Sequence, residues 1–168
     1  FDFTAEMRAT CHDMIGRLPE LAHIDLARVA VVYSRARNTS QYGVYASLTP
    51  LRFEHGRTTT ERRGKLYTIQ RVVGADGVEM LYILTFCLPR FMNLTFDEKL
   101  VTVLHELWHI SPEFNGDLRR HPGRCFAHSS SQKEYDAAMS VLARRWTDAR
   151  PPAERYEFLR HSWHELLD

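Results

Sequence analysis

The chain has 168 residues, of which 44% are hydrophobic and 26% charged, and its formal net charge is +1. This length predicts a single domain, residues 1–168, with its own hydrophobic core. The near-neutral charge argues against a dedicated nucleic-acid binder, so a nucleic-acid partner is not indicated. No apolar run approaches the roughly 20 residues of a membrane-spanning helix, so we expect no membrane partner.

The cysteines predict reduced thiols. Cys11, Cys87 and Cys125 are odd in number, and none belongs to a CxxC pair. A disulfide framework is therefore not expected, and a cytoplasmic location is favoured. Residues 1–20 lack the apolar core of a secretory signal, which agrees with that location.

The first half of the chain predicts one helix followed by strands. Residues 3–17 carry apolar side chains at helical spacing, with Thr4 as a candidate cap. Residues 28–36 are a β-branched run typical of a strand, and residues 42–54 form a second extended stretch interrupted at Pro50. The polar stretch 55–65 predicts a loop.

Two strand-like runs, at 65–73 and 78–86, flank Gly74-Ala75-Asp76-Gly77. Extended runs on either side of a Gly/Asp turn predict a β-hairpin. We expect one of its strands to lie at a sheet edge, where an extended peptide could pair with it.

A helix over about 96–109 follows. Thr95 and Glu98 have the spacing of a capping box, and Ser111-Pro112 ends the helix. Residues 110–130, rich in proline and glycine, predict irregular structure. Residues 132–146 and 152–167 predict two further helices.

His105-Glu106-Leu107-Trp108-His109 has the pattern HExxH. Residues four apart lie above one another on a helix, so both imidazoles can bind one metal ion. Glu106 emerges about 100° further around the helix, where it is placed to act on metal-bound water. Most other positions of this helix are apolar, Trp108 included, which predicts burial. Buried polar groups need a partner, and a metal is favoured over a structural hydrogen-bonded pair.

A catalytic zinc site needs a third protein ligand and one open position. We favour His128, which precedes the predicted 132–146 helix, over His121. A carboxylate ligand is a lesser alternative, and the candidates are Glu113, Asp117, Glu134 and Asp136. Asp117 and Asp136 are also candidates to orient a ligand histidine.

From about residue 95 to 140 the chain resembles the phage-type metallopeptidases, which are small zincin-like proteins. The likeness is carried by HELWHISPEFNGDLRRHPGRCFAHSSSQKEYD at 105–136. It implies an α+β, minimal zincin-like fold, with a small, mostly antiparallel sheet packed on the HExxH helix and further helices at its flanks. A wider likeness is to SprT-like proteases, where a third histidine lies near the start of another helix. His128 matches that role by position.

The predicted activity is zinc-dependent hydrolysis of a peptide or protein substrate. His105, His109 and His128 hold Zn²⁺, and Glu106 is the general base. Tyr135, Arg119 and Arg120 are candidates for an oxyanion donor, although the arginines are also suited to bridging nearby carboxylates.

Three other functions compete with this prediction. A non-catalytic metal-binding regulatory module would not need Glu106. A SprT-like protease acting on DNA-bound proteins would show DNA-stimulated cleavage with a steep salt dependence. A toxin or effector protease with one narrow target has the same sequence features.

Overall fold

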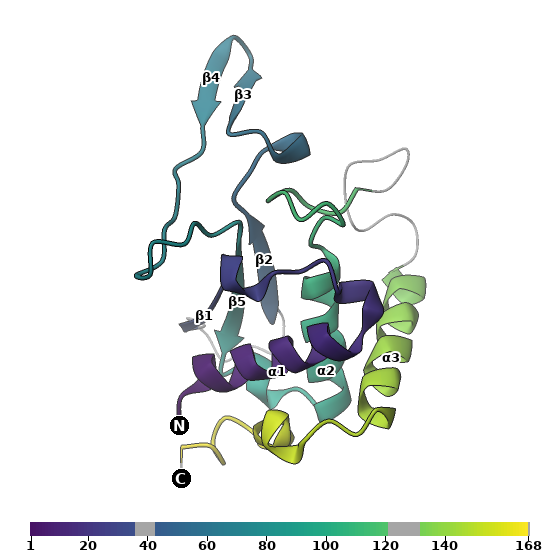
Figure 1. Cartoon of the computed structure of the whole chain (residues 1–168). Helices are drawn as coiled ribbons and strands as arrows, with labels where there is room; N and C mark the ends of the chain where they lie inside the picture. The colour runs from purple at the N-terminus through teal and green to yellow at the C-terminus, as the bar shows by residue number, and fades with distance from the viewer. Residues whose placement is uncertain (36–42, 121–131, 168) are drawn as a thin grey trace.

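The computed structural model describes residues 1–35, 43–120 and 132–167, with only the backbone described for 132–134. These residues form an α+β fold (Figure 1). The helices are α1 (Phe3–Arg17), α2 (Phe96–Trp108) and α3 (Gln132–Asp148). The strands are β1 (Val29–Arg35), β2 (Ala46–Pro50), β3 (Thr59–Arg62), β4 (Lys65–Thr68) and β5 (Tyr82–Leu88). Within the described part of the chain, every helix is too short or too polar to cross a membrane.

Strand β5 lies at the centre of a three-stranded sheet with the order β1-β5-β2. It pairs in parallel with β1 and antiparallel with β2. Its residues alternate between buried and half-buried, because one face of the sheet packs on the core. β2 is therefore an edge strand, and this edge lies beside α2.

The predicted hairpin between 65–73 and 78–86 is wrong in its pairing. Both edges of β5 are occupied by β1 and β2, so β5 cannot pair with β4. The turn itself forms, since the N–H of Gly74 donates to the carbonyl of Val78 at 2.8 Å. Only an isolated bridge between Val73 and Glu79 continues from it.

The real hairpin is β3–β4, inside the stretch that predicted a loop at 55–65. Its strands pair antiparallel from Thr59–Thr68 to Arg62–Lys65. The two residues between them, Arg63 and Gly64, both have positive φ, at 52° and 71°. Positive φ at both central residues is the geometry of a type I′ turn, which matches the twist of the flanking strands.

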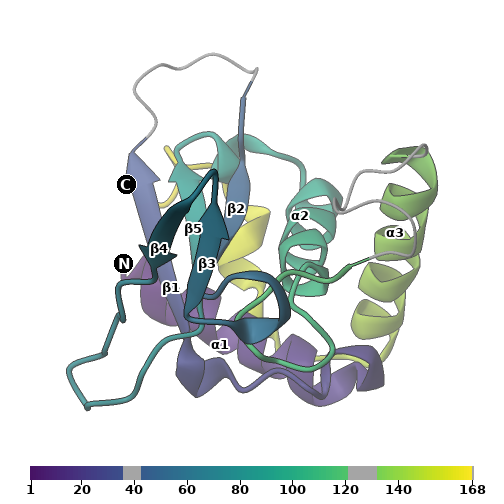
Figure 2. The ribbon, with the colours of Figure 1, turned by 90° about the horizontal axis from the view of Figure 1, so that it is seen from above.

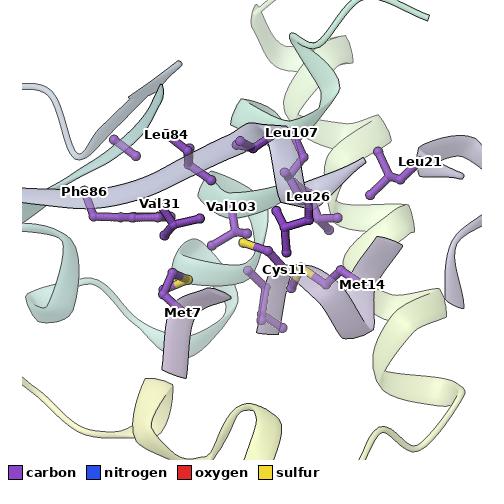
Figure 3. Packing of buried hydrophobic residues seen from close by; sticks show 14 of the residues in the cluster. Met7, Cys11, Met14, Leu21, Leu26, Val31, Leu84, Phe86, Val103 and Leu107 are labelled. Carbon is purple, nitrogen blue, oxygen red and sulfur yellow. The ribbon is translucent and has the colours of Figure 1, made fainter. Parts of the chain in front are cut away.

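The core lies between α1, the sheet and α2. Met7, Cys11 and Met14 of α1 are fully buried, and Figure 3 shows them facing strand and α2 side chains such as Leu84 and Val103. Helix α2 lies between the sheet and α3 (Figure 2). Because α2 has neighbours on several sides, Leu100, Val103, Leu104 and Leu107 are all buried.

Two parts of the helix prediction differ from the structure: the cap of α1 and the helix predicted at 152–167. Asp2, not Thr4, caps α1, and its carboxylate accepts from the N–H of Ala5 at 3.1 Å. The predicted helix at 152–167 is absent from the described chain, where short 3-10 turns at Ala153–Arg155 and Glu157–Arg160 occur instead.

Lys99 of α2 explains the broken C-terminal segment. This side chain is only 2% exposed, and its Nζ donates to the carbonyls of Leu159 at 2.9 Å and His161 at 2.7 Å. Those carbonyls bind an ammonium group rather than the N–H groups of a following helical turn. Burial lowers the pKa of Lys99 to about 8, against the opposing effect of Glu165.

We expect Lys99→Met to lower the free energy of unfolding by about 2 kcal/mol, because it leaves the buried carbonyl of Leu159 and the partly buried carbonyl of His161 without this donor. Urea denaturation measures the change. Lys65→Met, on the exposed hairpin, is the control and should be neutral. If Lys99→Met were as stable as the parent, the stabilisation from these hydrogen bonds would not exceed the cost of burying the charged ammonium group.

Candidate metal centre

Helix α2 is fixed at its N-terminus by the predicted capping box. The N–H of Glu98 donates to Thr95 Oγ1 at 3.3 Å, and the Glu98 carboxylate accepts from the N–H of Thr95 at 2.9 Å. These bonds satisfy two backbone donors that would otherwise lack partners. The helix then runs to Trp108, with His109 as its C-cap.

The second half of α2 brings together His105, Glu106 and His109. Their ligand atoms all lie within 4.8 Å of one another, a spacing that could hold a metal ion. The ring centroids of His105 and His109 are 4.6 Å apart and the rings are nearly perpendicular. Two imidazoles and a carboxylate, all partly or fully buried, fit the donor set of zinc.

Glu106 lies in an environment that favours its protonated form. Burial raises the pKa of its carboxyl to about 7, and the backbone N–H of Leu48 in β2 opposes part of this rise. A carboxyl with a pKa near neutrality can both accept and return a proton at physiological pH. The edge strand β2 therefore contacts the group expected to act as the base.

Tyr135, in the first turn of α3, packs against both histidines. Its ring centroid is 4.7 Å from that of His105 and 5.9 Å from that of His109. Its hydroxyl is buried and has no hydrogen-bond partner among the described residues. Burial also raises the pKa of this phenol, so it stays protonated. A buried hydroxyl that lacks a partner among the described residues calls for an explanation, and functional sites are one place where such groups occur.

Arg119 fixes the C-terminus of α2. Its Nε donates to the carbonyl of Trp108 at 2.7 Å, and its guanidinium lies 4.1 Å above the indole ring. Its backbone N–H donates to the carbonyl of His109 at 2.7 Å. A cation at this end also complements the helix dipole. Arg119 thus binds the C-terminal end of α2, whereas the sequence had suggested that it would bridge nearby carboxylates.

Asp117 anchors the loop after the histidines. Its carboxylate accepts from the backbone N–H groups of His55 at 2.9 Å and Leu118 at 2.8 Å, and from Arg120 Nε at 2.8 Å. Arg120 also lies 3.3 Å from the carboxylate of Glu54, so it bridges carboxylates as one of the predictions held. The hydroxyl of Tyr82 in β5 donates to the carbonyl of Asp117 at 2.8 Å.

A groove of about 760 Å³ leads to His105 and Glu106. One wall is the segment 43–46 at the start of β2, the floor is the polar face of α2, and the far wall includes Asp136 and Ser140 of α3. The groove borders the start of the edge strand β2 at Ala46, and the outward backbone groups of an edge strand can pair with an extended chain. The edge strand that borders this groove is therefore β2, not a strand of the predicted 65–86 hairpin.

The structure distinguishes among some of the candidates for the third metal ligand. His121 and His128 lie outside the described residues, as does the side chain of Glu134. Glu113 is exposed, and the bonds of Asp117 make it a loop anchor. Asp136 alone among the described candidates approaches a histidine, with 3.9 Å between its Oδ1 and Nδ1 of His105.

The sequence did not predict the contribution of β2 or Tyr82 to the site. The stretch 42–54 looked extended, but nothing in its pattern placed Leu48 beside Glu106. Tyr82 resembles an ordinary strand residue, although its ring is fully buried and its hydroxyl organises the loop at 116–117. Only the alternation of buried residues along β5 marks it as facing the core.

Glu106 should destabilise the metal-free protein at neutral and higher pH. The pKa of Glu106 is about 7 in the folded protein and 4.5 in the unfolded chain. The free energy of unfolding therefore falls as the pH rises from 4.5 to 7, because the unfolded chain loses this proton first. We expect Glu106→Gln to raise the free energy of unfolding by at most about 3 kcal/mol near pH 8, and to change it little near pH 4. Urea denaturation in chelator measures both, with Glu154→Gln as the exposed control. An equal effect at both pH values would contradict the burial argument.

Comparison with known proteins places this site in a family. Residues 4–129 match the family described as "Putative phage metallopeptidase". No curated protein and no solved structure was found to match the chain. The match covers well over half of the chain and includes α1, the sheet, α2 and the loop that follows. The chain belongs to the phage metallopeptidase family.

Proposed function

We propose that this protein is a zinc-dependent peptidase in which Glu106 acts as the general base. The observation that supports this most is the environment of Glu106. Its carboxyl is buried beside two imidazoles, at the end of a groove that follows an edge strand. A structural histidine pair would not need a carboxyl with a pKa near 7 in that place.

The proposed ligands are His105, His109 and His128, with His128 as the least direct assignment. Tyr135, in the first turn of α3, touches both described histidines, and His128 precedes the first residue of α3 by four positions. At no more than about 3.6 Å per residue, the chain that enters α3 is short enough to bring His128 to the same place. Asp136 is better suited to orienting His105 than to binding metal, because it is half-exposed and outside the 4.8 Å cluster.

When bound, zinc would acidify a water molecule and polarise the scissile carbonyl. Glu106 accepts a proton from the attacking water and returns it to the leaving amine. The substrate lies extended in the groove and pairs with the start of β2, ahead of Leu48, whose N–H binds Glu106. The hydroxyl of Tyr135 donates to the oxyanion that develops on the carbonyl, because no described residue competes for it.

Metal content tests the ligand set. We expect about one zinc per chain in the parent protein, measured by mass spectrometry after purification. His105→Ala and His128→Ala should lose it, and His121→Ala should keep it. Loss in His121→Ala with retention in His128→Ala would move the third ligand to His121. Absence of metal from every sample, even after zinc is resupplied, would contradict a metal site.

Cleavage of fluorescein-labelled casein tests the chemistry. Glu106→Gln should keep its zinc and lose about 10²-fold or more in kcat, as expected for a general base. Tyr135→Phe should keep zinc and KM and lose about 10²-fold in kcat, as for an oxyanion donor. Tyr67→Phe on the hairpin is the matched control.

These variants also separate the peptidase from its main rival. If the protein were a non-catalytic metal-binding module, Glu106→Gln, Tyr135→Phe and Tyr67→Phe would all bind zinc. None of them would cleave casein, and neither would the parent protein. If Tyr135 were only a packing residue, Tyr135→Phe would leave kcat unchanged.

A further inference from the structure

The β3–β4 hairpin is a feature that the proposed peptidase does not use. It projects from the end of the molecule opposite the two chain termini (Figure 1). Of residues 59–68, only Thr60 is partly buried and the others are exposed. A two-stranded hairpin exposed on both faces contributes little burial, so its side chains are free to serve a partner.

Three cations are gathered at the hairpin's end, and we call them the tip cluster: Arg62, Arg63 and Lys65. Residues 57–65 hold four of the chain's 22 Lys and Arg and one of its 21 Asp and Glu, which gives a net charge of +3. The whole chain has a net charge of +1, so everything outside this segment sums to −2. The positive charge is thus concentrated on one projection.

The tip cluster differs from the arginines at the hairpin's base. There, Arg52 and Arg71 both bind the carboxylate of Glu79, and Arg120 binds Asp117. The two arginines lower the pKa of Glu79 to about 2, Arg71 having the larger effect. Within the described part of the chain, no member of the tip cluster forms an ion pair.

The arrangement of the tip cluster is unfavourable in the free protein. Arg62 and Lys65 are directly opposite each other across the hairpin, and like charges in that position repel. Arg63 occupies a turn position with φ of 52°, where Asn or Gly is preferred. Each choice opposes folding slightly, and a polyanion that neutralises these charges would remove the repulsion between Arg62 and Lys65.

One face of the hairpin also carries groups that suit a nucleic acid. Cross-strand pairs share a face, so Arg62 and Lys65 lie on the same side as Thr60 and Tyr67. Tyr67 is 48% exposed. Cations and a hydroxyl bind phosphates, an aromatic ring contacts sugar or base, and the major groove of DNA admits a two-stranded β-ribbon.

From these observations we infer that the β3–β4 hairpin binds duplex DNA, with the tip cluster on the phosphate backbone. The hairpin's base is tied to the loop that follows the metal histidines, through the bond from the N–H of Arg52 to the carbonyl of Gly116 at 3.0 Å. Bound DNA would therefore lie on the same side of the molecule as that loop. The inference does not depend on the peptidase, because neither Glu106 nor a metal takes part in the binding.

Fluorescence anisotropy with a labelled DNA duplex of about 20 base pairs, in about 50 mM KCl, tests the inference. The test variant is Arg62→Ser/Arg63→Ser/Lys65→Ser. The control is Arg35→Ser/Arg144→Ser/Arg150→Ser, which removes the same charge from exposed positions elsewhere. We expect about tenfold or greater weakening in the test variant only, with a fall of about 2–3 in the slope of log K against log salt.

Equal weakening in both triple variants would overturn the inference, because it would indicate net charge rather than the hairpin. No binding by the parent protein, or tighter binding to poly-glutamate or to an RNA duplex than to DNA, would overturn it as well. Because the tip cluster is repulsive, the test variant should be at least as stable to urea as the parent.

Arg63→Asn provides a second check that does not risk misfolding. Asn suits the positive φ, so this variant should be more stable and yet bind DNA about two- to threefold more weakly. Unchanged DNA binding in both Arg63→Asn and the triple variant would contradict the inference. Measurements on Glu106→Gln in chelator should match those on the parent, which keeps this result separate from the outcome of the cleavage assays.

Discussion

Helix α2 has to satisfy two opposing requirements, and the rest of the structure depends on how it does so. It packs between the sheet and α3 with Leu100, Val103, Leu104 and Leu107 buried, yet it carries two imidazoles and a carboxyl into that interior. Buried polar groups destabilise a fold unless a partner compensates them. A metal ion bound by the two imidazoles would supply the partner that these polar groups need.

Contacts at both ends of α2 fix the helix and so fix the positions of its polar side chains. The capping box satisfies the first turn, while Arg119 binds the last carbonyls and stacks on Trp108. Lys99 ties the same helix to the segment around Leu159 and His161. Because the Lys99 bonds join residues 60 and 62 positions apart, α2 is held by tertiary contacts as well as by its own local capping. Precise positioning of ligands is what a catalytic metal site requires.

Local signals predicted α2 correctly, and non-local pairing explains most of the errors. The capping box and Ser111-Pro112 define α2 within a few residues of sequence. By contrast, the partners of β5 come from segments 32 to 53 positions earlier, so the Gly74–Gly77 turn predicted a hairpin that competition for β5 prevents. The C-terminal segment follows a helical pattern, but Lys99 takes the carbonyls that such a helix would use. His105, Glu106 and His109 follow from spacing alone, whereas Leu48 and Tyr135 reach the site only through folding. The assignment of His128 stays a prediction.

The β3–β4 hairpin and α2 are under different constraints over evolutionary time. A substitution in α2 disturbs packing on several sides and the positions of two histidines at once. None of residues 59–68 is buried, so substitutions there leave the core and the HExxH helix as they are. The length and charge of this hairpin can therefore change without altering the packing of the HExxH helix. Relatives that share the HExxH helix need not share a binding partner, and comparing their hairpins would be more informative about their targets than comparing their active sites.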